Sequence, residues 1–155
     1  GQLEKWQTGE FTENFVEPAE DGPALGPLAA EMTDEDVEAS IKSDLETLAN
    51  WVMDIVLDYQ LYKSNDALQL RSSFNQILSQ TLSSKISGVC RIGIGPRNNA
   101  GSRISIVQDK ANNTIEEICP TIFNISSGEA AMLCIFGELL VQADRIGCYR
   151  SCANR

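Results

Sequence analysis

The sequence contains no histidine, and none of its apolar stretches approaches the roughly 20 residues of a membrane-spanning helix. Without histidine, Cys148 and Cys152 lack the partners that zinc sites usually combine with such a spacing, so we expect no metal site there. No charged segment followed by an apolar one opens the chain, which argues against a signal peptide. The chain begins with glycine rather than methionine, which indicates a processed chain or a piece of a longer protein.

The sequence also lacks the loop with which many nucleotide-binding proteins hold phosphates. None of its lysines follows a glycine, so the pattern Gly-x-x-x-x-Gly-Lys-Ser/Thr is absent. Four apolar residues followed by Asp-Glu, the usual metal-binding strand, are also absent; residues 51–54 are the nearest match but lie in a helical pattern. Gly93 and Gly95 form no dinucleotide loop, because Pro96 follows and a third glycine is missing.

Charge is distributed unevenly along the chain. Residues 1–60 hold 15 of the 22 acids and two bases, a net charge of −13, whereas residues 61–155 hold 7 acids and 10 bases, a net charge of +3. The overall charge of −10 argues against non-specific DNA binding by the whole chain. The five cysteines are irregularly spaced and odd in number, which does not indicate a disulfide framework. We therefore expect reduced thiols and a cytoplasmic protein.

The first half of the chain divides into two predicted segments. Residues 1–32 are acidic and rich in proline and glycine, without a period of 2 or 3.6, and indicate an acidic arm or loop. Residues 33–84 predict a helical hairpin. Apolar residues recur at steps of three or four over residues 34–62, and a second helix runs from a cap at Ser64-Asn65 to Leu82.

The second half predicts a β-hairpin and one further helix within residues 85–146. The expected pieces are strands near residues 89–94 and 104–108, a short extended piece over 114–118, and a helix over 128–144 that ends at Gly147. That last helix is apolar over most of its circumference, which is typical of a helix packed inside a larger α/β body. Residues 147–155 form a tail to which we assign no function.

The segment Ser126-Ser127-Gly128-Glu129 stands directly ahead of this last helix. The first backbone N–H groups of a helix have no partner within the helix, and the helix start carries a partial positive charge. Together with two hydroxyls and a glycine that admits close approach, such a start suits a phosphate group. The same residues equally fit ordinary capping of a buried helix by Ser126 or Ser127.

Residues 125–129, Ile-Ser-Ser-Gly-Glu, followed by an apolar helix, resemble the signature motif of ABC-type ATPases in their SMC-like and RecF-like branch. The motif there commonly reads Leu-Ser-Ser-Gly-Glu or Leu-Ser-Gly-Gly-Gln. Residues 91–107 resemble the β-hairpin that precedes the signature in AAA-like members, and the similarity covers roughly residues 74–146. The fold class it implies is α/β: part of a P-loop NTPase of ABC/SMC type, with two helices, a β-hairpin and a buried signature helix.

The resemblance also implies a role in trans. In ABC-type dimers the signature of one subunit faces the γ-phosphate of an ATP held by the other. Ser126 would then reach the γ-phosphate and Gly128 would let the backbone approach, while Ser127 and Glu129 fill the remaining motif positions. The resemblance implies ATP and Mg²⁺ as cofactors, with the metal site outside this chain, and a second copy or a P-loop-bearing protein as partner. It further implies a nucleic-acid partner for the full-length protein, and no membrane.

On this hypothesis the chain is a fragment of an ATPase domain that contributes half of a shared nucleotide site. It carries no catalytic residue of its own and is not an active enzyme alone, because the phosphate loop and the metal-binding strand are missing. The alternative is a non-enzymatic helical protein-interaction module in which Ser126 and Ser127 act only as a helix cap.

Overall fold

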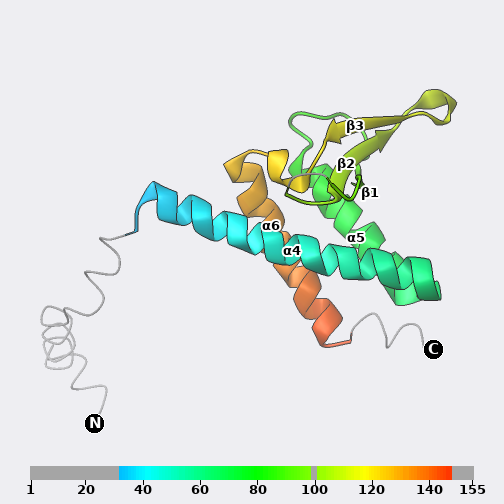
Figure 1. Cartoon of the computed structure of the whole chain (residues 1–155), viewed down its shortest axis with the longest axis horizontal. Coiled ribbons are helices and arrows are strands. Elements are labelled where there is room, and N and C mark those ends of the chain that lie inside the picture. The colour runs from blue at the N-terminus through cyan, green and yellow to red at the C-terminus, as the bar shows by residue number, and fades with distance from the viewer. Residues whose placement is uncertain (1–31, 99–100, 148–155) are drawn as a thin grey trace, which may run out of the picture. The chain divides into compact units, whose positions relative to one another are not determined.

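The structure, a computed structural model, describes residues 32–98 and 101–147 (Figure 1). These residues form a mixed α/β arrangement of three α-helices and a small three-stranded antiparallel sheet. The elements, in chain order, are α4 (Asp34–Tyr62), α5 (Asn65–Thr81), β1 (Arg91–Ile94), β2 (Ile104–Asp109), η1 (Ala111–Asn113), β3 (Ile115–Cys119), η2 (Ile122–Asn124) and α6 (Ser127–Arg145). The acidic arm expected over residues 1–32, apart from its last residue, and the tail after Gly147 lie outside the described residues.

Residues 1–37 form a unit separate from residues 38–155, and the structure describes the first unit from Met32 onward. Here the predicted start of α4 is confirmed. The Asp36 N–H donates to Thr33 Oγ1 over 3.2 Å, and the Asp36 carboxylate accepts from the Thr33 N–H over 3.1 Å. This reciprocal arrangement satisfies two backbone donors that the helix start would otherwise leave free.

Both predicted helices are confirmed to within a residue of their boundaries. The side chain of Ser64 caps the start of α5 by accepting a hydrogen bond from the Ala67 N–H over 3.3 Å. Leu82 is the C-cap residue at the end of this helix. The rings of Trp51 on α4 and Phe74 on α5 meet edge to face, with their centroids 6.5 Å apart. Trp51 Nε1 also donates to Asp144 Oδ2 on α6 over 3.0 Å, so one tryptophan joins all three helices.

The sheet has the strand order β1-β2-β3, with both pairings antiparallel. Strands β1 and β2 are the predicted hairpin, and β3 is the short extended piece predicted after it. Gly93 lies in β1 opposite Ser105 in β2. A Cβ atom on Gly93 would lie 2.7 Å from Ser105 Oγ and 2.9 Å from Val107 Cγ1, so this glycine serves close packing between the two strands.

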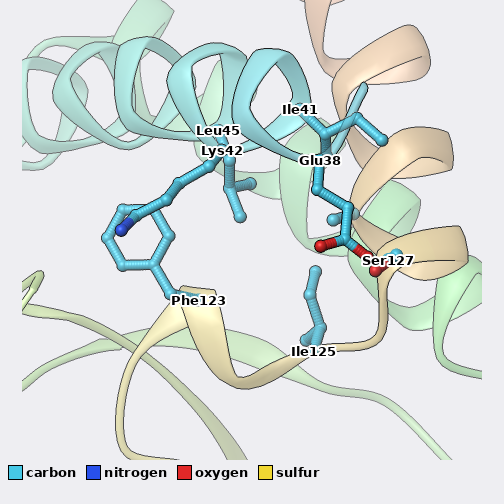
Figure 2. Close-up of a pocket in the computed structure, with 8 residues that line it drawn as sticks. Glu38, Ile41, Lys42, Leu45, Phe123, Ile125 and Ser127 are labelled. Atoms are coloured by element: carbon cyan, nitrogen blue, oxygen red, sulfur yellow. The ribbon is translucent and has the colours of Figure 1, made fainter. Parts of the chain in front are cut away.

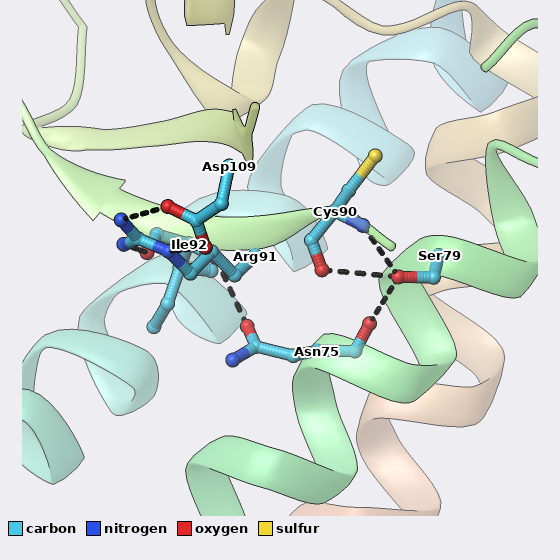
Figure 3. A network of polar contacts seen from close by, with 6 residues as sticks. All are labelled: Asn75, Ser79, Cys90, Arg91, Ile92 and Asp109. Carbon is cyan, nitrogen blue, oxygen red and sulfur yellow. Dashed lines mark hydrogen bonds and ion pairs between the residues drawn. The ribbon is translucent and has the colours of Figure 1, made fainter. Parts of the chain in front are cut away.

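The outer edge of β1 is covered by side chains of α5, as Figure 3 shows. The Ile92 N–H donates to Asn75 Oδ1 over 2.9 Å, and the Cys90 N–H donates to Ser79 Oγ over the same distance. An exposed strand edge offers unpaired backbone groups to other chains. Here two polar side chains of a helix accept from two backbone donors at that edge, Cys90 N–H and Ile92 N–H, and anchor the sheet to α5.

The last predicted helix is confirmed as α6, and Gly147 follows its cap with a φ of +77°. Its inner face is buried, with Leu133 fully inaccessible and Leu140 7% exposed. Its outer face is not buried within residues 32–98 and 101–147. Four large apolar side chains there are 44–65% exposed: Met132, Ile135, Phe136 and Leu139. The expectation that this helix is buried therefore holds for one face only, because the described residues cover α6 from one side.

Candidate functional site

The chain approaches α6 through a locally fixed turn, η2. Asn124 Oδ1 accepts hydrogen bonds from the N–H of Thr121 over 3.0 Å and from its hydroxyl over 3.1 Å. Thr121 Oγ1 in turn accepts from the Phe123 N–H over 3.2 Å. These short-range bonds hold the turn that delivers Ile125 and Ser126 to the start of the helix.

Ser126 and Glu129 form a capping box at the start of α6. The Glu129 N–H donates to Ser126 Oγ over 3.3 Å, and Glu129 Oε1 accepts from the Ser126 N–H over 2.9 Å. Ser126 is therefore the N-cap residue, as the capping interpretation of the sequence expected. Its hydroxyl accepts a hydrogen bond in this role and retains its own proton for a second partner.

Two backbone donors of the first turn stay available. Among the described residues, no acceptor is hydrogen-bonded to the N–H of Ser127 or of Gly128. Ser126, Ser127 and Gly128 are all exposed, and a Cβ atom built on Gly128 would meet nothing within 4 Å. The start of a 19-residue helix thus presents two free N–H groups and two hydroxyls on an open surface. This combination of donors suits an anion.

Glu129 faces the other way, into the protein. The residue is 9% exposed, and its Oε1 atom lies 3.0 Å from Lys85 Nζ, on the segment that follows α5. Burial alone would raise the pKa of the Glu129 carboxyl. The hydrogen bonds from the Ser126 N–H and from Lys85 outweigh burial, so this pKa lies below its usual range. Of the four predicted site residues, Glu129 is the one whose side chain points into the protein and is hydrogen-bonded there.

A cavity of about 370 Å³ opens beside Ser127, between α4 and the start of α6 (Figure 2). Its walls are mostly apolar, and Phe123 contributes an aromatic ring to them. Two oppositely charged residues of α4, Glu38 and Lys42, line the same cavity. The open side of the helix start therefore borders a concave surface with both apolar and charged groups.

Two basic residues of the hairpin are engaged away from the start of α6. Arg91 pairs with Asp109, at 2.9 Å from Nε to Oδ2, and Arg103 Nε donates to Gly95 O over 3.3 Å. Lys85, which sequence reasoning missed, contacts the start of α6 directly through Glu129. It stands 44 positions before Glu129, and no local pattern links the two residues.

Within the described parts of the chain, no group of three or more His, Cys, Asp or Glu residues is arranged to hold a metal ion. The Cys148 and Cys152 pair lies outside those parts. No helix over residues 32–98 and 101–147 is long and apolar enough to cross a membrane.

No protein-family model, curated protein or solved structure matches this chain.

Proposed function

We propose that this chain is part of an SMC/RecF-like ATPase and supplies the signature half of a nucleotide site shared between two subunits. Ser126, Ser127 and Gly128 contact the γ-phosphate of an ATP molecule that the partner holds. Glu129 acts on the same site indirectly, because it holds the Ser126 N–H and the Lys85 ammonium group. The phosphate loop and the Mg²⁺ ligands come from residues outside this sequence, in a second copy or in a P-loop-bearing partner.

The free donors of Ser127 and Gly128 are the observation that carries this proposal. A helix start that serves only as a cap needs no exposed hydroxyl beyond the N-cap residue, yet Ser127 adds one next to two unbonded N–H groups. Preorganised N–H groups and a helix dipole stabilise charge on a phosphoryl oxygen without having to reorganise during the reaction. The space beside Gly128 is open, since a Cβ atom built there would meet nothing within 4 Å, and this leaves room for the approaching phosphate.

The outer face of α6 supports the same proposal. Its four exposed apolar side chains lie three or four positions apart, so they form one continuous stripe. Exposed apolar patches of this kind mark surfaces that are covered in the complete assembly. An ATPase core that continues beyond this sequence would provide such a cover.

The flanking coding sequence is the first test of this proposal. We expect a Gly-x-x-x-x-Gly-Lys-Ser/Thr loop upstream of Gly1 and an apolar strand ending in Asp-Glu downstream of Arg155. A complete reading frame without either motif would contradict the ATPase proposal and leave the interaction-module alternative.

A protein-level test uses the intact, P-loop-containing protein with Ser127→Arg. Ser127 caps nothing, so its replacement preserves the Ser126–Glu129 box while a bulky cation fills the phosphate position. We expect loss of ATP-driven dimerisation in sedimentation velocity and loss of ATP hydrolysis. The matched control is Ser43→Arg, at an exposed serine of α4 that lines none of the cavities beside α6. Equal activity of the two variants would refute a signature role.

The alternative, a non-enzymatic helical interaction module, is favoured by one observation. Ser126 is fully accounted for as an N-cap, and the apolar stripe on α6 would serve a protein partner as well as an ATPase core. On that hypothesis Ser127→Arg has no effect on any ATP-dependent property, whereas changes in the stripe abolish partner binding.

A further inference from the structure

The two edges of the sheet differ in how the rest of the fold covers them. At the outer edge of β1, Asn75 and Ser79 of α5 accept hydrogen bonds from the strand backbone. The opposite edge is formed by β3, the last strand in the order β1-β2-β3. The first three residues of β3 are exposed, and Figure 1 shows the connection between β2 and β3 pointing away from the helices. Within the part of the chain that the structure describes, this second edge is open.

The backbone groups that β3 presents at this edge follow from its pairing with β2. The Lys110 N–H donates to the Thr114 carbonyl over 2.8 Å, and the register of β3 then runs without a shift from Ile115 to Glu117. Residues of an antiparallel strand bond alternately to one side and to the other. Thr114 and Glu116 therefore bond to β2, so the N–H and C=O groups of Ile115 and Glu117 point to the open edge. Among the described residues, no group is hydrogen-bonded to these four.

The side chains along the open edge carry a negative charge. Ile115 and Glu117 project from one face of β3, and Glu116 projects from the other. The Glu116 carboxylate lies 3.0 Å from Lys110 Nζ, so its charge is neutralised within the hairpin. In the described segments, no lysine or arginine forms an ion pair with Glu117. The edge therefore combines free backbone groups with an uncompensated carboxylate and with the Ile115 side chain, which is 61% exposed.

We propose that the edge of β3 binds an extended segment of another protein as a fourth strand, with a lysine or arginine opposite Glu117 and an apolar residue opposite Ile115. In this recognition mode the main-chain hydrogen bonds give affinity, and alternate side chains give specificity. An antiparallel segment reads, from its N-terminus, a basic residue, any residue and an apolar residue. This binding site goes beyond the proposed function and does not depend on it.

The negative charge favours a basic segment over two other occupants of the edge. A second copy that paired through β3 would bring the Glu116 and Glu117 side chains of both copies together, and like charges opposite each other are destabilising. Residues 1–31 of this chain hold one base and seven acids, a net charge of −6, and would be repelled as well. A basic segment instead gains an ion pair with Glu117.

The test titrates the 155-residue chain with the peptide acetyl-Thr-Lys-Thr-Val-Thr-amide and follows the amide signals of Ile115 and Glu117 by NMR. We expect both signals to shift, whereas the same peptide with glutamate in place of lysine leaves them unchanged. N-methylation of the peptide's lysine should abolish binding, because it removes an N–H that bonds to β3. The matched control is N-methylation of the central threonine, whose N–H points away from β3, and it should leave binding intact.

Two variants of the protein separate the backbone contribution from the charge. Ile115→Pro removes an outward N–H, which an edge strand tolerates, and Thr114 already has the extended backbone that precedes proline, with φ −90° and ψ 151°. We expect this variant to lose the lysine peptide, while the matched control Ile115→Val binds like the wild type. Glu117→Lys should weaken binding of the lysine peptide about fivefold and allow the glutamate peptide to bind. Urea unfolding of each variant shows whether it is folded.

Several outcomes would overturn this binding site. They are the absence of shifts at Ile115 and Glu117, equal shifts with both peptides, and retained binding of the peptide with N-methylated lysine. The N-methylated peptides decide the question even if Ile115→Pro fails to fold. Concentration-dependent shifts of the same signals in the free chain would assign the edge to a second copy. Shifts caused by ending the chain at Gly147 would assign it to residues 148–155.

Discussion

The hydroxyl of Ser79 bonds to both backbone groups of Cys90. It accepts from the Cys90 N–H over 2.9 Å and lies 3.0 Å from the Cys90 carbonyl oxygen, sharing its single proton between that oxygen and the carbonyl of Asn75 (Figure 3). One side chain of α5 thus supplies the backbone contacts that a neighbouring strand would otherwise give to the edge of the sheet. This contact fixes the sheet on α5, and through it the hairpin that leads toward α6.

Ser79→Ala should therefore destabilise the protein by about 1–3 kcal/mol, because the N–H of the buried residue Cys90 loses its acceptor. The measurement is urea unfolding followed by circular dichroism. Ser83→Ala is the control, since Ser83 is exposed and bonds only to the nearby Gln80 carbonyl. Its effect should stay within about 0.5 kcal/mol. Equal losses in the two variants would show that the edge contact does not stabilise the sheet.

Gly137 lies in the middle of α6, where glycine normally weakens a helix. A Cβ atom there would lie 2.7 Å from Leu48 Cδ2 and 2.8 Å from Leu48 Cδ1, and Leu48 is itself 5% exposed and unable to move freely. Gly137→Ala should therefore lose about 1–3 kcal/mol from overpacking, more than the roughly 1 kcal/mol gained in helix propensity.

The control for this substitution is Gly128→Ala, whose added Cβ meets nothing within 4 Å. It should leave the free energy of unfolding unchanged or slightly raise it. In a double-mutant cycle, Gly137→Ala and Leu48→Ala should be strongly coupled, because Leu48→Ala removes the atoms with which the added Cβ would clash. Additive effects would contradict the close contact.

The stability of the protein should depend on pH through Glu129. Since the pKa of Glu129 is lower in the folded protein than in the unfolded chain, its contribution to stability is fully present above the unfolded pKa and is lost as pH falls through the folded pKa. Glu129→Gln should therefore be less stable than the wild type at neutral pH, and the difference should narrow under acid conditions. The measurement is urea unfolding at a series of pH values; a constant difference would contradict it.

The same substitution at adjacent positions on the two faces of α6 should change the free energy of unfolding by very different amounts. Leu139 is 65% exposed, so Leu139→Lys should alter the free energy of unfolding by no more than about 0.5 kcal/mol. Leu140 is 7% exposed, and Leu140→Lys should cost several kcal/mol, on the order of 3–5, because it buries an unpaired charge. Thermal unfolding compares them. If Leu139→Lys proved as damaging as Leu140→Lys, the outer face would already be covered in this chain.

Some features of the chain were determined by sequence alone because they depend on neighbours within one or two turns. The starts of α4, α5 and α6 follow from Thr33, Ser64 and Ser126, each of which reaches a backbone N–H three positions on. The strands follow from short apolar runs bounded by turn residues. The third strand extended the predicted hairpin to a three-stranded sheet, and its position was correct to within a residue.

The tertiary structure decided what each of these elements faces. Local periodicity marked α6 as apolar nearly all round, but only packing shows which side is covered and which four side chains stay exposed. The contacts of Ser79 with Cys90 and of Lys85 with Glu129 depend on the path of the chain between them, which no spacing encodes. The capping motif could therefore be predicted from the sequence, whereas the charge that surrounds it required the fold.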